Sequence, residues 1–216
     1  MDKLRIKLVS FTDYLPIIGV LAFVGIYIYS ATLYPGGSQV NSNSKGFDWM
    51  NNYWCTMFAL KAMNGQPNPA RPFSIAGMII LWTSLLVFFF KFSEILSPGQ
   101  IWKRVIQIAG TVSLMFASLL FTNLHDFATT FSSAVGLFAL IGIMLGVAKS
   151  NLNFYKITGI VCMILMGINN YIYYSRQGIN FLPLIQKLTF LVVLSWVVGL
   201  NYRMIQIKRK KKFPGH

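Results

Sequence analysis

The side chains that could bind a ligand lie in short polar stretches between long apolar segments. Amide and ionisable groups are costly in lipid, so their presence at the ends of such segments points to a site. Three cations, Arg71, Arg176 and Lys187, could each pair with a phosphate, and the aromatic side chains could cover the glycerol and upper chain of a lipid. The candidate ligand-binding residues are Asn52, Trp54, Arg71, His125, Asp126, Asn169, Asn170, Tyr173, Tyr174, Arg176 and Lys187.

Each of these residues also has a purely structural interpretation. Asp126 would cap the apolar segment that follows it, and Asn169 with Asn170 would hydrogen-bond a neighbouring helix. Lys187 would extend its ammonium to water, and His125 would be a hydrogen-bonded surface group. Their common side of the membrane is the feature that favours one shared pocket at the outer leaflet.

An enzyme would need a nucleophile or a metal. Cys55, His125 and Asp126 could act as nucleophile, base and orienting group, but no local feature marks Cys55 as activated. A metal site needs several ligands at one ion, and haem held between helices needs paired axial ligands. The sequence has only two histidines, and His216 is expected on the opposite side of the membrane from His125. We therefore expect no catalytic residue, no metal and no cofactor. A lipid-modifying enzyme built on Cys55, His125 and Asp126 remains an alternative.

A non-catalytic lipid-binding or membrane-organising protein is the function that the polar residues favour. Transport of an ion or a small solute is the other alternative, since Asn169, Asn170 and Lys187 could line a polar path. The expected partner is a membrane lipid, and the oligomeric state is left open.

Composition predicts the fold class, an all-α bundle of six transmembrane helices. Only 11% of the 216 residues are charged, against about 25% in a soluble domain. The apolar runs have the length of about 20 residues that crosses about 30 Å of hydrocarbon. The predicted spans are residues 13–33, 73–92, 101–124, 127–148, 157–175 and 181–202. Residues 1–12 form the N-terminus, 13–202 the membrane domain with an outer loop at 34–72, and 203–216 a polybasic tail.

The distribution of lysine and arginine predicts the orientation. Fourteen of the 19 such residues fall on the side of both termini and five on the other, so both termini are expected in the cytoplasm and the protein in the plasma membrane. The net charge of +14 could indicate nucleic acid, but the cations lie at segment ends, so no nucleic acid is expected. Anionic inner-leaflet lipid is the expected partner of the tail. The tail cluster is Lys208, Arg209, Lys210, Lys211 and Lys212.

The outer loop contains a predicted short helix. Asp48 is a suitable N-cap, and Asn64 followed by Gly65 is a suitable stop. Apolar residues recur between them at helical spacing, among them Met50 and Trp54. This helix is too short to span a bilayer, so we expect it at the outer interface or re-entrant.

Several short motifs carry a resemblance to a known family. They are YPGGS at residues 34–38, NYWC at 52–55, NGQPNPAR at 64–71, and His125 with Asp126. With these the chain resembles bacterial membrane proteins of the domain-of-unknown-function family 998, over nearly its whole length. It is also similar in topology to the six-span DRAM/FRAG/Sfk-type membrane proteins. That second resemblance implies a sizeable first outer loop and a link to lipid handling, GPI-anchor maturation and membrane organisation.

Overall fold

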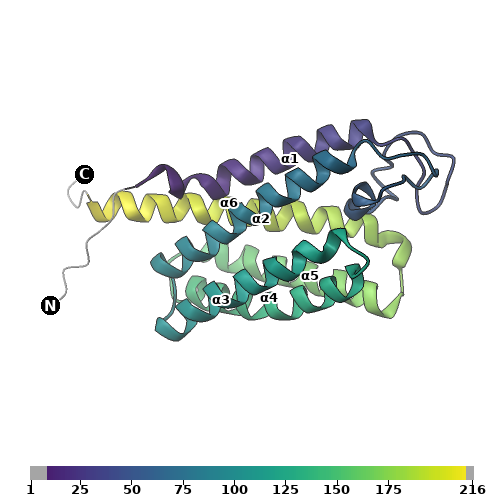
Figure 1. The fold of residues 1–216 in the computed structure, drawn as a ribbon. Helices are drawn as coiled ribbons and strands as arrows, with labels where there is room; N and C mark the ends of the chain where they lie inside the picture. The colour runs from purple at the N-terminus through teal and green to yellow at the C-terminus, as the bar shows by residue number, and fades with distance from the viewer. Residues whose placement is uncertain (1–8, 213–216) are drawn as a thin grey trace.

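The computed structural model describes residues 9–212, and over that range it is helical, with isolated bridges but no β-strand. Figure 1 shows the long helices and the irregular segment that joins the first two. The long helices are α1 (Leu15–Leu33), α2 (Arg71–Ile95), α3 (Gln100–Ala117), α4 (His125–Ala148), α5 (Asn153–Ser175) and α6 (Leu182–Lys212). The short 3-10 helices are η1 (Phe11–Asp13), η2 (Trp54–Phe58), η3 (Ser118–Phe121) and η4 (Ile179–Phe181).

Six helices in the described range are long and apolar enough to cross a membrane. The predicted six-helix, multi-pass fold class is therefore confirmed. The start of α1 and the end of α6 lie at one end of the bundle, as six antiparallel crossings require, and the loop between α1 and α2 lies at the opposite end (Figure 1). We call these the inner and the outer end.

The helices pair in chain order, with one weak pair. α1 packs on α2, α2 on α3, α3 on α4 and α5 on α6, whereas α4 packs much less on α5. Small residues allow the close pairs, because a larger side chain would collide with the neighbouring helix. A Cβ at Gly19 of α1 would lie 1.6 Å from Ser84 Oγ of α2, and one at Gly146 of α4 would lie 2.3 Å from Leu96 O.

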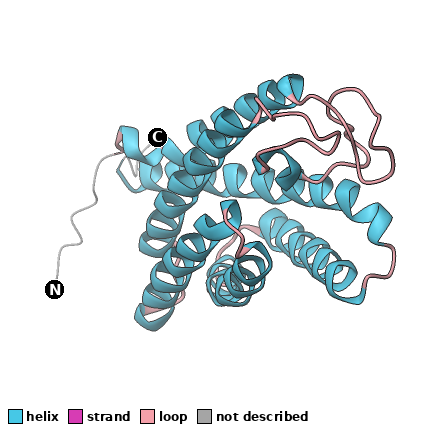
Figure 2. Ribbon diagram, turned by 45° about the vertical axis from the view of Figure 1, so that its right-hand side comes forward, coloured by secondary structure: helices cyan, strands magenta, loops and turns pink. Residues whose placement is uncertain are grey.

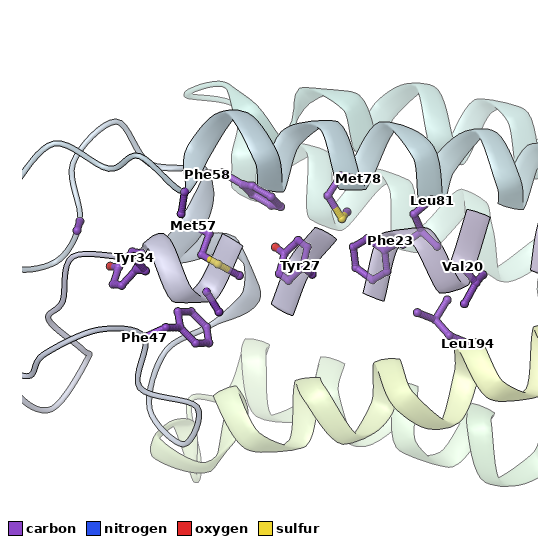
Figure 3. Close-up of a cluster of buried hydrophobic side chains, with 13 residues drawn as sticks. Val20, Phe23, Tyr27, Tyr34, Phe47, Met57, Phe58, Met78, Leu81 and Leu194 are labelled. Carbon is purple, nitrogen blue, oxygen red and sulfur yellow. The ribbon is translucent and has the colours of Figure 1, made fainter. Parts of the chain in front are cut away.

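The apolar core has two parts. The outer part joins α1, α2 and the outer segment and includes Phe23, Tyr27, Met57 and Leu81 (Figure 3). The inner part lies among α2, α3, α4, α5 and α6 and is represented by Phe92. The outer part buries apolar residues of the loop against the spans, so the loop is packed on the bundle.

The outer segment, residues 34–70, is mostly irregular (Figure 2), and we call it the cap. The helix predicted between Asp48 and Gly65 is absent as such, since only η2 is helical there. Asp48 instead closes a turn by accepting the Met50 and Asn51 amides at 3.0 and 3.1 Å. Met50, which helical spacing would place on a buried face, is 57% exposed. An isolated helix of this length is marginal, and side-chain hydrogen bonds hold the cap backbone in its place.

Helix α6 is longer than predicted and absorbs most of the predicted tail. Its 31 residues extend about 46 Å at 1.5 Å per residue, well beyond the hydrocarbon thickness. Residues 203–212 of the predicted tail are therefore a helical continuation of α6. The remaining parts of the predicted termini, residues 1–8 and 213–216, lie outside the described residues.

The inner end is fastened by one buried carboxylate. Asp13 is 3% exposed, and its Oδ1 accepts from Lys91 Nζ of α2 at 2.8 Å and from Lys208 Nζ of α6 at 2.7 Å. The Ser10 amide donates to its Oδ2, and Asn201 Nδ2 donates to its backbone carbonyl. We call Asp13, Lys91 and Lys208 the inner ion cluster. It joins the chain before α1 to two other helices.

Candidate functional site

The part of the chain that the structure describes has a cavity of about 900 Å³ between its helices that could take a ligand. Helices α2 to α6 all contribute to its wall, and α1 does not. Ligand pockets measure about 300–1,000 Å³, so this one lies at the upper end. Its polar lining residues are Thr130, Ser133, Asn169, Asn170, Tyr174, Gln186 and Thr189.

The cavity is polar toward the outer end and apolar toward the middle of the membrane. Asn170 and Gln186 lie within about two turns of the outer ends of α5 and α6. Leu85, Leu140 and Met163 line the deep end. From Thr130 to Leu140, α4 rises about 15 Å, which is half of a hydrocarbon core of about 30 Å. The cavity therefore has the length of one leaflet.

Asn169, Asn170 and Tyr174 are the predicted site residues that the structure brings to the cavity. Asn169 Nδ2 donates to Thr189 Oγ1 across the α5–α6 contact and to Leu165 O at 3.1 Å. Asn169 thus fills the predicted structural role of joining helices and also faces the cavity.

A second group of predicted residues joins the cap to α6. Lys187 Nζ donates to Asn52 O and, at 3.0 Å, to Pro183 O. Asn52 is fully buried, and its Nδ2 donates to Gly37 O at 3.0 Å. The Trp54 amide donates to Gln186 Oε1 at 3.2 Å. Since Gln186 also lines the cavity, it links the cap directly to the cavity wall.

Arg71 lies apart from the cavity. It is the first residue of α2, and its Nε donates to Phe58 O of the cap at 2.9 Å. Arg71 and Lys187 are therefore bound to backbone carbonyls, and neither lines the cavity. Two of the three cations expected to meet a phosphate hold the cap on the bundle.

Asp126 and Tyr173, two further predicted residues, join the outer ends of α4 and α5. Tyr173 Oη donates to Asp126 Oδ1 at 2.8 Å, and the Tyr174 and Thr130 hydroxyls lie 3.0 Å apart. The Arg176 guanidinium lies over the Tyr173 ring, 5.2 Å from its centroid. His125 begins α4, and its side chain lies outside the described part of the structure.

Sequence reasoning did not single out Thr130, Ser133, Thr189 or Gly167 as lining residues. The sequence does contain a signal for three of these residues. Thr130 and Ser133 are spaced as on one face of a helix in the fourth span, and Thr189 follows Gln186 by one turn in the sixth. Nothing in the sequence marked Gly167 as facing a cavity.

The chemistry of Cys55 bears on the enzyme alternative. Burial raises the pKa of the Cys55 thiol from 9.0 to about 11, and the thiolate is the nucleophilic form. At neutral pH the side chain is therefore a neutral thiol. Within residues 9–212 no group of three or more His, Cys, Asp or Glu side chains is placed to hold a metal ion.

We expect Cys55 to react slowly with iodoacetamide. With its pKa raised from 9.0 to about 11, Cys55 has about 100-fold less thiolate at pH 8 than an ordinary cysteine. The rate of alkylation should therefore rise about tenfold per pH unit up to pH 10. Alkylation followed by mass spectrometry in a Cys162→Ala background measures this rate, with the same protein unfolded in detergent as reference. Rapid labelling at pH 7 would show an activated thiol and would favour the enzyme alternative built on Cys55, His125 and Asp126.

No protein-family model, curated protein or solved structure matches this chain. Its proposed function therefore depends on the cavity, the cavity lining and its position in the bundle.

Proposed function

We propose that this chain is a non-catalytic, multi-pass plasma-membrane protein that binds a lipid in the cavity between α2 and α6. The observation that carries the proposal is the leaflet-long cavity, polar at its outer end and apolar at its deep end. A membrane lipid has the same division between headgroup and chain.

The size of the cavity supports an occupant. Protein interiors are close-packed, and voids much larger than a water molecule are few. Side chains around an unfilled space of about 900 Å³ forfeit contacts on the side that faces it, and part of this lining, on α4 and α5, is exposed. In a bilayer, acyl chains are the abundant apolar groups that could restore those contacts.

The orientation proposed from the cation distribution places the inner ion cluster in the cytoplasm and the cap outside. Within the basic end of α6, Lys208 is engaged by Asp13, whereas Lys210 is exposed. The side chains of Lys211 and Lys212 lie outside the described residues. We propose anionic inner-leaflet lipid as the partner of the exposed cations in this stretch.

Mass spectrometry of lipid extracted from the purified protein tests this function. We expect about one lipid per chain to be retained, as a single pocket of this size predicts. Ser133→Phe would fill the cavity from α4 and should reduce the retained lipid several-fold. Thr83→Phe is the matched control, because Thr83 is exposed on α2 and does not line the cavity.

Two outcomes would contradict the proposal. One is the absence of retained lipid together with no binding of added lipid. The other is an equal loss of lipid from Ser133→Phe and Thr83→Phe, which would show that retention occurs on the outer surface of the bundle.

A further inference from the structure

The described lining of the cavity carries no charged side chain. Lys187 and Arg71 donate to cap carbonyls. Arg176 is exposed over the Tyr173 ring and does not line the cavity. A phosphate inside the cavity would lose its water without gaining a counter-ion, and such burial is strongly unfavourable. The cavity therefore disfavours an anionic headgroup.

The polar groups that do line the cavity suit hydroxyl groups. The Asn170 amide and the Gln186 amide nitrogen make no hydrogen bond within the described part of the chain. The Asn170 amide can both donate and accept a hydrogen bond. The Gln186 nitrogen can only donate, and the Gln186 oxygen already accepts from the Trp54 amide. Asn170 is exposed and Gln186 is half-buried. An amide that faces hydrocarbon without a hydrogen-bond partner is costly, so an uncharged ligand rich in hydroxyls would complete this wall.

Helices α4 and α5 leave a lateral opening to this cavity. They touch near the inner end, where a Cβ at Gly159 would meet Met144 Sδ at 2.7 Å. They touch again at the outer end through Tyr173 and Tyr174. Between these contacts the facing lining residues are exposed. They are Ser133, Ala134 and Leu137 on α4 and Met163, Met166, Gly167 and Asn170 on α5.

Gly167 marks the opening itself. A Cβ at this position would have no atom within 4 Å, although the residue lines the cavity. We call this gap the window. It faces the surrounding lipid in the outer half of the membrane, because α5 ends at the outer side only about 12 Å further on.

We infer that the cavity takes a lipid with an uncharged, hydroxyl-bearing headgroup, which moves in from the outer leaflet through the window between α4 and α5. This inference rests on the proposed lipid-binding function. It adds the chemical class of the ligand and the direction of its access.

Two probes that differ by one phosphate test the ligand class. Monooleoylglycerol and oleoyl lysophosphatidic acid share their glycerol and their chain, and native mass spectrometry of the delipidated full chain counts the bound molecules of each. We expect monooleoylglycerol to bind about 100-fold more tightly, because only the second probe would bury a charge. Equal binding, or preference for the phosphate, would overturn the inference while leaving lipid binding intact. Binding of neither probe would instead contradict the proposed function and the inference with it.

A matched pair of glycine substitutions tests the window. Gly167→Trp should place an indole in the gap and lower the rate of monooleoylglycerol uptake at least tenfold. Gly25→Trp is the control, since Gly25 of α1 is an exposed helical glycine that also has no atom near an added Cβ. Ala134→Trp, from the α4 side, gives the same test if the first variant folds poorly. Unchanged uptake in a folded window variant would overturn the lateral route.

Discussion

Asp13→Asn should lower the free energy of unfolding by about 3 kcal/mol, the low end for removal of one partner from a buried ion pair. Two lysines, Lys91 and Lys208, would then face each other without the carboxylate between them. Both side chains keep some contact with water, at 21% and 15% exposure, which limits the cost. Titration of the unfolding in mixed micelles measures the loss.

Glu94→Gln is the matched control for this change. Glu94 lies in the last turn of α2 at the same inner end and is exposed, so its substitution removes the same charge without breaking a described ion pair. We expect a change within about 0.5 kcal/mol. Equal losses from the two variants would show that the inner ion cluster contributes nothing beyond net charge.

The effect of Asp13 should depend on pH in one direction. Burial alone would raise the pKa of this carboxyl, but hydrogen bonds from Lys208, Lys91 and the Ser10 amide outweigh it and hold the pKa below 3.8. A lowered folded-state pKa gives stability that is present above the unfolded-state pKa and lost as pH falls through the folded one. The difference between the wild type and Asp13→Asn should therefore be constant from pH 5 to 7 and shrink below about pH 4.

The sequence was sufficient for the spans and insufficient for the cap. Apolar length alone decides a membrane helix, so the six spans follow from local composition. The cap depends on contacts between distant residues, such as Lys187 with Asn52 and Trp54 with Gln186. Apolar spacing between Asp48 and Gly65 favours a helix. The spacing does not show which backbone groups will instead bind side chains from distant parts of the chain, and these contacts decide the conformation of the cap.

The candidate site was predicted in part for a similar reason. The cost of amides in lipid drew attention to Asn169 and Asn170, and both line the cavity. The same reasoning could not show that Arg71 and Lys187 would be used by cap carbonyls. A cation near a membrane boundary has several low-energy partners, and only the fold decides between a ligand and the backbone.

Asn68 carries the other large effect that we expect, because its side chain holds three backbone groups of the cap. Its Nδ2 donates to Met57 O at 3.1 Å and Ala59 O at 3.0 Å, and its Oδ1 accepts from the Ala70 amide at 3.1 Å. The residue is 7% exposed, so water cannot replace these bonds easily. Met57 O would keep its bond from Ser74 Oγ in an Asn68→Ala variant, while the other two groups would lose the partner that the side chain supplies.

Asn68→Ala should therefore cost about 2 kcal/mol, since the buried Ala70 amide and the part-buried Ala59 carbonyl would each lose a partner, at on the order of 1 kcal/mol each. The loss should be concentrated in the cap, and hydrogen exchange of the residue 57–70 amides should accelerate while α3 and α4 keep their protection. Asn64→Ala is the control, because Asn64 Oδ1 accepts one exposed bond from the Gln66 amide, and its removal should cost less than about 1 kcal/mol. If both variants exchanged alike, the cap would be held by its apolar contacts with α1 and α2 and not by this side chain.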